Sequence, residues 1–132
     1  MLDTNIVSDM VRNPEGAAVV RSRVAGKGGL CISAVTVCEL RFGVKKKGSE
    51  ALRNRVETFL LAVPAVPLES DASERFAEIR YELERRGTPI GPYDMLIAAH
   101  ALSLDLTLVT ANIREFSRVD GLKVENWLEP AP

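Results

Sequence analysis

The sequence predicts an α/β fold in which a parallel sheet of four to five strands lies between two layers of helices. Short apolar, β-branched stretches alternate along the chain with longer segments of helical periodicity. Strands that alternate with helices form parallel sheets that are covered on both faces. The 132 residues, 46% of them hydrophobic, suffice for one core, and no repeat or linker divides them. We therefore expect residues 1–132 to form a single domain.

The expected elements follow one another in a regular order. Strands are expected at residues 1–3, 30–33, 65–68 and 106–110, and residues 122–127 can add a fifth. Helices are expected at residues 5–12, around the inner stripe Ala17, Val20 and Val24, at 34–47, around 52–60, at 70–86, at 92–104 and at 112–119. Ser70-Asp71 is the expected cap of the fifth helix, and Val35, Cys38 and Phe42 are expected to face the sheet from the third.

Composition excludes several classes of protein. The chain has no apolar run long enough to span a membrane and no signal-peptide pattern at its start, so we expect a cytoplasmic protein without membrane contact. One histidine and two cysteines cannot assemble the usual zinc site, so Cys31 and Cys38 are expected to be buried free thiols.

The net charge of −1 gives no overall signal for nucleic acid, but a basic stretch stands out. Arg41, Lys45, Lys46 and Lys47 all lie in the second half of the third expected helix, and the three lysines are its last residues. Such a run is usually a solvated face. The alternative is a local patch that attracts phosphates, which an almost neutral total charge does not exclude.

Three acids occupy positions that fit a shared site. Asp3 ends the first expected strand, Glu39 lies in the second turn after the second strand, and Asp94 opens a helix just after Pro92. Each has a simpler explanation, as a helix cap, a border residue or a helix-dipole partner. Together, however, the three lie at the carboxyl edge of the sheet, where such folds bind ligands. Converging carboxylates repel one another unless a cation joins them, and hard oxygen ligands suit Mg²⁺ or Mn²⁺.

A fourth polar group follows the strand at residues 106–110. Thr110 ends this strand, Asn112 lies two residues further along, and Glu115 lies three residues after that. Thr110 or Asn112 can simply cap the short helix that follows. Both also lie at the same edge of the sheet as the three acids, so the fourth contribution to the site is open between Asn112 and Glu115.

These stretches together resemble the PIN-domain ribonucleases, and within them the VapC toxins of bacterial toxin–antitoxin pairs. The resemblance rests on LDTNIVS, SAVTVCELRFG, GTPIGPYDMLIAAHALS and LVTANIREFSRVDGLKVENW, which extend over almost the whole chain. It implies a PIN-like three-layer α/β/α fold and a metal-dependent endoribonuclease that a VapB-type antitoxin neutralises. It also implies a homodimer, and transfer or ribosomal RNA as the substrate.

By position, Asp3, Glu39 and Asp94 match the three metal-site acids of this family, and Thr4 matches the polar residue after the first acid. Asn5, next to Thr4, is a further supporting candidate, as are Thr110 and Asn112. Many PIN domains carry Asp where this chain has Asn112, whereas in similar toxins the last acid is the Glu of the REF triplet, here Glu115. Because Asn112 adds no charge, the number of metal ions is left at one or two.

The implied chemistry is metal-assisted hydrolysis, which needs neither a catalytic histidine nor a catalytic cysteine. Asp3 and Asp94 are expected to hold Mg²⁺, and Glu39 to contact it through water or to accept a proton. The products then carry 5′-phosphate and 3′-hydroxyl ends. His100 lies six residues after Asp94, on a different side of the helix, and is expected to be structural. The emptied acidic pocket should also attract a basic residue from the antitoxin.

Other functions fit less well. A haloacid-type phosphatase needs D-x-D around its nucleophile, where this chain has Asp3-Thr4-Asn5, and a receiver domain needs an early acid pair and a late lysine. A non-catalytic nucleic-acid-binding domain would retain the basic stretch but has no reason to gather carboxylates. A P-loop or dinucleotide site would require a glycine-rich phosphate loop, which the sequence lacks. The nucleic-acid binder and the Mg²⁺-dependent phosphotransfer domain are kept as alternatives.

Overall fold

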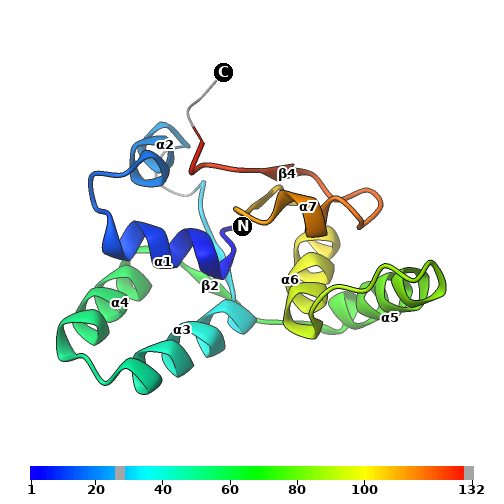
Figure 1. Cartoon of the computed structure of the whole chain (residues 1–132), viewed down its shortest axis with the longest axis horizontal. Helices are drawn as coiled ribbons and strands as arrows, with labels where there is room; N and C mark the ends of the chain where they lie inside the picture. Colours follow the sequence, from blue (N-terminus) through cyan, green and yellow to red (C-terminus); the bar gives the residue numbers. More distant parts are fainter. Residues whose placement is uncertain (26–28, 130–132) are drawn as a thin grey trace.

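The computed structural model describes residues 1–25 and 29–129 and has helices on both sides of a few short strands (Figure 1). The helices within the described residues are α1 (Thr4–Arg12), α2 (Ala17–Ala25), α3 (Ala34–Lys47), α4 (Glu50–Ala62), α5 (Ser70–Arg85), α6 (Pro92–Ser103) and α7 (Ile113–Phe116). The strands are β1 (Ile32–Ser33), β2 (Ala65–Val66), β3 (Leu108–Val109) and β4 (Val124–Glu125). This order matches the predicted alternation of strands and helices.

All strand pairing in the described residues is parallel, as predicted, but the strands are much shorter than expected. β1 pairs with β2 and β3 pairs with β4, each over two residues. The first expected strand is reduced to a single bridge, between Leu2 and Val109. Leu2 also donates a backbone hydrogen bond to the Cys31 carbonyl, 2.9 Å away. The N-terminal segment therefore lies between the two strand pairs and is hydrogen-bonded to both sides.

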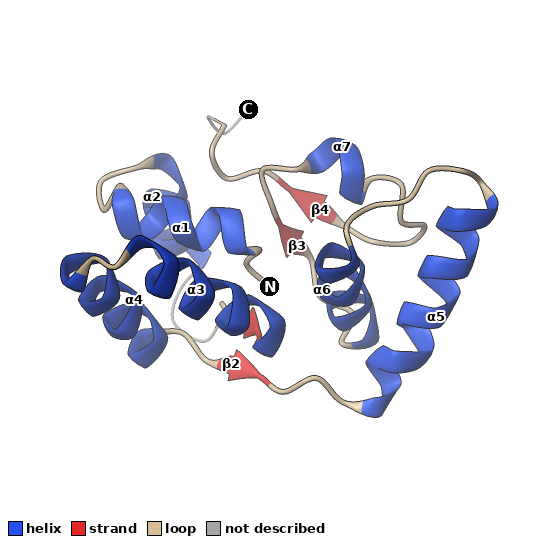
Figure 2. Ribbon diagram, turned by 60° about the horizontal axis from the view of Figure 1, so that its bottom comes forward, coloured by secondary structure: helices blue, strands red, loops and turns tan. Residues whose placement is uncertain are grey.

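The helices form two layers around these strands. Figure 2 shows α1 to α4 on one side of the strands and α5 and α6 on the other. Leu2, Ile6, Ile32 and Val56 belong to the core on the first side. The core on the second side includes Leu83, Ile97, Leu108 and Phe116. Two apolar layers over one set of parallel strands give the three-layer α/β/α arrangement that the sequence predicted.

Local signals explain where α3 begins and ends. The Ser33 hydroxyl accepts a hydrogen bond from the Val35 N–H and caps the helix. Gly48 ends it with φ of 68°, in the left-handed region that glycine adopts without strain. The start of α5 differs from the prediction, because Ser70 and Asp71 lie inside the helix and Glu69 occupies the N-cap without a side-chain hydrogen bond.

Several positions that were expected to face the core are exposed. Val24 is 86% exposed and Val20 is also exposed, so the predicted inner stripe of α2 is wrong, and Ala18 is the buried residue of that helix. Phe42 is 68% exposed. α3 extends past the strands and packs on α1 and α4 through Leu40 and Val44, which lie on another side of the helix.

The cysteines also differ from the prediction. Both are free thiols, as expected, but Cys31 is half-buried and Cys38 is exposed. Cys38 lies one turn before Phe42 on α3 and shares its exposed side, so the same misjudged face explains both errors. None of the helices within residues 1–25 and 29–129 combines the length and the apolar character that crossing a membrane requires.

Candidate active site

The first acid of the candidate site is held in a fixed position. Asp3 is only 3% exposed and caps α1, where its Oδ1 accepts a hydrogen bond from the Thr4 N–H at 2.8 Å. Its Oδ2 accepts hydrogen bonds from Thr110 Oγ1 at 2.8 Å and from Asn5 Nδ2 at 3.1 Å. The simple cap interpretation is thus correct for one oxygen, while the other binds the nearby Asn5 and also Thr110, which is 107 residues away in the sequence.

The supporting residues join the end of β3 to the start of α1. Thr110 Oγ1 accepts a hydrogen bond from the Asn112 N–H at 3.0 Å, and Asn5 Oδ1 accepts one from the Ala111 N–H at 3.1 Å. These bonds fix the turn that leads into α7, the helix that carries Glu115. Asn112 occupies the N-cap of α7 but forms no side-chain cap hydrogen bond there. Its side chain therefore does not have the capping role that was considered for it.

The second acid is held through threonines. Thr4 Oγ1 donates to Glu39 Oε1 at 2.6 Å and also approaches Thr36 Oγ1 at 3.3 Å. Thr36 is fully buried and lies one turn before Glu39 on α3. Thr36 was not among the site residues predicted from the sequence, although a threonine three residues before a candidate acid on a buried helix face is a usable signal. Through Thr4, the acid on α3 is linked to the residue that follows Asp3.

The third acid lies close to the others but is bonded differently. Asp94 is in the first turn of α6, after Gly91 and Pro92, and its carboxyl group forms no hydrogen bond or ion pair with the described residues. Its pKa is raised to about 6, first by burial and then by the negative charges of Asp3, Glu39 and Glu115. Four acids from four separate segments therefore share one electrostatic environment, as expected for the carboxyl edge.

The pKa of Asp3 is also raised, because burial disfavours its charged form. The hydrogen bonds from Thr110, Thr4 and Asn5 act in the opposite direction, and the charge of Glu39 adds to the rise. The two aspartates thus differ in kind. Asp3 has donors that stabilise its carboxylate, whereas Asp94 faces other negative charges and has no donor in the described part of the chain. A cation in this region would favour the charged form of both.

In the described part of the chain, no three Asp, Glu, His or Cys side chains come together as a ready-made metal-binding group. The charges of Asp3, Glu39 and Glu115 act on Asp94, but the carboxyl groups do not come together as one cluster in the described residues. Their donor set nevertheless fits a hard divalent cation, because it consists of carboxylate oxygens with threonine hydroxyls and asparagine amides around them. The uncompensated charge on Asp94 is the observation that a cation would best explain.

The remaining candidates are placed as follows. His100 is buried, and its Nδ1 lies 2.7 Å from Ser33 Oγ, which agrees with the structural role expected for it. Arg41 forms an ion pair with Glu57 of α4. Lys47 borders a groove that also contains Glu39, whereas Lys45 lines a separate hollow with Arg41. Within the described residues, Lys47 thus shares a cavity with a candidate acid.

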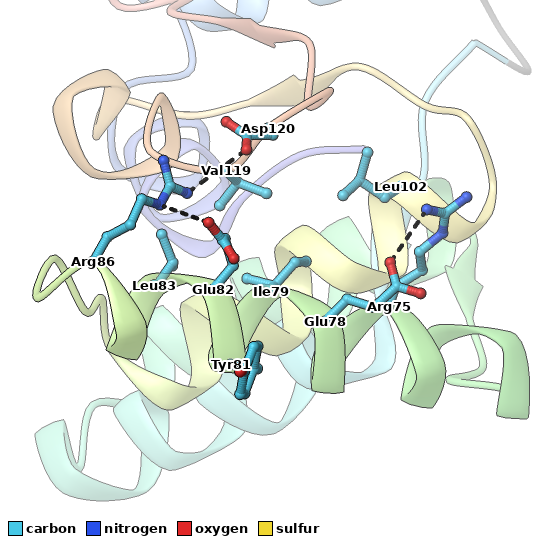
Figure 3. Close-up of a pocket in the computed structure, with 10 residues that line it drawn as sticks. All are labelled: Arg75, Glu78, Ile79, Tyr81, Glu82, Leu83, Arg86, Leu102, Val119 and Asp120. Carbon is cyan, nitrogen blue, oxygen red and sulfur yellow. Dashed lines mark ion pairs between the residues drawn. The ribbon is translucent and has the colours of Figure 1, made fainter.

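Another hollow, along α5, is unrelated to these acids. Figure 3 shows that its charged residues face one another: Arg86 pairs with Glu82 and Asp120, and Arg75 pairs with Glu78. Exposed pairs of this kind are ordinary surface features. The hollow contains none of the four acids and is not the candidate site.

Comparison with known proteins shows the family of this chain. The family model described as "PIN domain" matches residues 1–122. The chain belongs to the PIN-domain family. The tRNA(fMet)-specific endonuclease VapC of Shigella flexneri is 42% identical over 130 residues, covering 96% of each chain. This PIN domain is therefore also a member of the VapC ribonucleases.

Solved structures agree in fold. The structure described as VapBC2 from Rickettsia felis bound to a DNA fragment from their promoter has a TM-score of 0.90 at 34% identity, covering 96% of this chain and 97% of that one. DNA-bound VapBC from Salmonella typhimurium has a TM-score of 0.87 at 38% identity, covering 96% of each. The PIN fold predicted from the sequence resemblance is confirmed. The four- to five-stranded sheet expected within it corresponds to two separate two-stranded pairs in the described residues.

Proposed function

We propose that this PIN domain is the toxin of a type II toxin–antitoxin pair and cleaves RNA as a Mg²⁺-dependent endoribonuclease. The observation that carries the proposal is the position of Asp94. Its pKa is raised to about 6 by burial and by Asp3, Glu39 and Glu115, in a chain that is 42% identical to a VapC endonuclease. Perturbed acids gathered in this way are typical of functional sites.

Asp3, Asp94 and Glu39 are the proposed metal ligands, Glu39 directly or through water, and Glu115 is the proposed fourth catalytic acid. When bound there, Mg²⁺, or Mn²⁺ in its place, would supply a Lewis acid for the phosphodiester and lower the pKa of water. Asn112 contributes no charge, and we assign it a supporting role together with Thr4, Asn5 and Thr110.

The residues of the chain have distinct tasks in this proposal. Thr110 and Asn5 donate to Asp3 Oδ2 and hold that carboxylate in one orientation. Thr4 donates to Glu39 Oε1 and leaves Oε2 of Glu39 available to accept a proton from water. Among the described residues Asp94 has no such donor, and its carboxylate is free to adjust. Water adds across the bond between phosphorus and the 3′-oxygen, so the products end in 5′-phosphate and 3′-hydroxyl.

We also propose how the strands combine, how the chain assembles and which RNA it cuts. The backbone bonds of Leu2 to Cys31 and of Val109 to Met1 support one functional sheet of five short parallel segments. We propose that residues 1–132 act as one domain, in the cytoplasm, as a homodimer. The name of the Shigella relative supports transfer RNA as the substrate class, with ribosomal RNA as the other candidate.

A VapB-type antitoxin is the proposed partner, since both structural neighbours are described as VapBC. A basic residue from such a partner can occupy the acidic region, where four carboxylates attract a guanidinium or ammonium group. Inhibition and metal binding would then use the same oxygens.

Digestion of total RNA tests the proposed activity. The purified protein should cut RNA in Mg²⁺ and not in EDTA, and ligation-based mapping should find new 5′-phosphate ends at a small number of sites. Products with 2′,3′-cyclic phosphate ends, or equal cleavage in EDTA, would mean a different mechanism. Addition of a VapB-type protein should stop the cleavage.

A further inference from the structure

The single histidine of the chain is a buried polar residue that the proposed mechanism does not use. His100 is 1% exposed and lies on α6, six residues after Asp94. Its Nδ1 is 2.7 Å from Oγ of Ser33, which is fully buried, ends β1 and caps α3. α3 and α6 belong to opposite helix layers (Figure 2). This hydrogen bond therefore joins the helix that carries Glu39 to the helix that carries Asp94.

The direction of this hydrogen bond follows from the other partner of Ser33. The Ser33 Oγ accepts a hydrogen bond from the Val35 N–H at 3.1 Å, which is the cap of α3. Among the described residues, the acceptor for the hydroxyl hydrogen itself is His100 Nδ1. Nδ1 therefore accepts, and the neutral ring carries its proton on Nε2. The reverse direction would leave both the Ser33 hydroxyl hydrogen and Nε2 without partners in the described residues.

The surroundings of the ring favour this neutral form. The pKa of His100 is lowered, chiefly by burial, although the Pro67 carbonyl and the charge of Glu69 act in the opposite direction. Nε2 is buried and has no hydrogen-bond partner of regular geometry in the described part of the chain. A charged ring would point Nδ1–H at the Ser33 hydroxyl, whose own hydrogen would then lose its acceptor. The neutral ring is thus the form in which the Ser33 hydroxyl both donates and accepts.

The bond lies where it can set the spacing of two acids. Glu39 follows Ser33 by six residues, and His100 follows Asp94 by six residues, which is about 9 Å along each helix. α3 and α6 also pack directly on each other. Because the first turns of a helix move together, a shift at Ser33 carries Glu39 with it. A buried hydroxyl that loses its partner costs free energy, so the bond disfavours such shifts.

We propose that His100 is a positioning residue for the reaction: through Ser33 it fixes the start of α3 against α6 and thereby the distance between Glu39 and Asp94. This inference rests on the proposed ribonuclease function, in which both acids belong to one site. A misplacement of about 1 Å in such groups can lower a rate about a hundredfold. A bond less than two turns from each acid therefore affects turnover, and it does so without contacting RNA.

Nuclear magnetic resonance of the wild type tests the hydrogen bond itself. Because the chain has one histidine, ¹⁵N-labelled protein prepared without a histidine tag gives one imidazole to assign. At pH 7.5 and without metal, long-range ¹H–¹⁵N correlations should show the proton on Nε2 and Nδ1 as a hydrogen-bond acceptor. Ser33→Gly should shift the Nδ1 resonance and leave the proton on Nε2. A charged ring, or a proton on Nδ1 in the wild type, would overturn the proposal.

Cleavage kinetics in Mg²⁺ separate positioning from RNA binding. His100→Leu offers no acceptor to Ser33, and its kcat should fall roughly tenfold to a hundredfold, the range for outer residues that orient metal ligands, with KM unchanged. His100→Asn should stay close to the wild type, since its amide oxygen can take the place of Nδ1. Ser33→Gly removes the hydroxyl but keeps a residue that tolerates the cap position, and it should match His100→Leu. The double variant should fall no further, because both changes remove the same bond.

Ile79→Ala is the control for a general loss of stability. Ile79 is buried on α5, in the core that also contains Ile97 and Ala101 of α6, and takes no part in the hydrogen bond. A cavity in the core is costly, so this variant should melt at least as far below the wild type as His100→Leu, as measured by circular dichroism. Assayed well below its melting temperature, it should retain the kcat of the wild type. If His100→Leu does not fold, Ser33→Gly gives the same comparison.

Equal kcat values for His100→Leu and the wild type would overturn the inference, as would a loss that His100→Asn or Ile79→Ala shares. A rise in KM without a change in kcat would also overturn it, by assigning the effect to RNA binding. These outcomes leave the proposed function intact, provided that the wild type cuts RNA in Mg²⁺. A wild type that cuts no RNA would refute the proposed function and, with it, any role of His100 in the reaction, whatever the state of the imidazole.

Discussion

Replacing Asp94 by Asn should stabilise the metal-free protein at neutral pH. The pKa of Asp94 is raised from 3.8 to about 6 in the folded protein, so the charged form is disfavoured by folding. A shift of that size corresponds to an upper bound of about 3 kcal/mol. Because the carboxyl group is only partly buried, solvent screening reduces the expected effect to about 1–2 kcal/mol. Asn is neutral and, since Asp94 forms no hydrogen bond with the described residues, it loses no partner.

The pH dependence follows from the direction of the shift. A folded-state pKa above the unfolded value means that the folded protein binds the proton more tightly, so Asp94 destabilises it when ionised. This penalty is complete above pH 6, decreases between about pH 6 and pH 4, and disappears below the unfolded pKa of 3.8. The gain from Asp94→Asn should follow the same course.

Thermal unfolding followed by circular dichroism in EDTA measures this effect. At pH 7.5 the variant should melt roughly 3–8 °C above the wild type, given about 3–4 °C per kcal/mol for a chain of this size. At pH 4 the two should melt together. Asp105→Asn is the control, since Asp105 is 94% exposed and its backbone conformation suits Asn equally well. A variant that melts at or below the wild type at pH 7.5, or that gains equally at pH 4, would refute the electrostatic cluster.

Three further outcomes are expected. Asp3→Asn should lower the free energy of unfolding, measured in urea, by about 1–3 kcal/mol, although it removes the same charge as Asp94→Asn. The reason is that the new Asn amide faces the donors of Thr110 and Asn5. A variant as stable as the wild type would show that these hydrogen bonds are weak. Phe116→Ala should cost about 3–5 kcal/mol, since Phe116 is fully buried in the core beside α6, and a loss below 1 kcal/mol would contradict that packing. High Mg²⁺ should weaken a VapB-type partner in calorimetry, and an affinity independent of Mg²⁺ would argue against shared oxygens.

The layout of the acids was predictable because it depends on topology. Strands and helices alternate, so the positions after strands gather at one edge regardless of the details of packing. Asp3, Glu39 and Asp94 are separated by 36 and 55 residues in sequence, yet they share one field in the structure. Family resemblance added Glu115, whose charge also acts on Asp94.

The faces of the helices were less predictable. In α3 the pattern of Val35, Cys38 and Phe42 fits one apolar side, but only the first turns of this helix lie against the strands. Beyond Glu39 the helix packs through Leu40 and Val44, and Phe42 is left in solvent. The periodicity of a helix identifies its apolar side, but it does not show what that side packs against. The neighbour of Phe42 is solvent, and a pattern of apolar residues does not distinguish such an exposed side from one that faces a core.

The hydrogen bonds of the site were beyond prediction for a different reason. The bonds of Thr110 and Asn5 to Asp3 join residues up to 107 positions apart and depend on individual side-chain orientations. Strand length was also overestimated, because apolar β-branched residues extend past the two residues that pair. Such residues fill the core on either side of a strand as well as within it.

Cleavage of RNA by Asp94→Asn, compared with Asp105→Asn, tests the central claim most directly. The two substitutions remove the same charge from the chain, one within the acidic cluster and one on the open surface. In Mg²⁺, initial rates on the same RNA should fall at least a hundredfold for Asp94→Asn, in line with the loss of a group that acts on developing charge, and stay unchanged for Asp105→Asn. Wild-type rates in Asp94→Asn, with cleavage still abolished by EDTA, would show that the metal is held elsewhere and that the acids around Asp94 are not the active site.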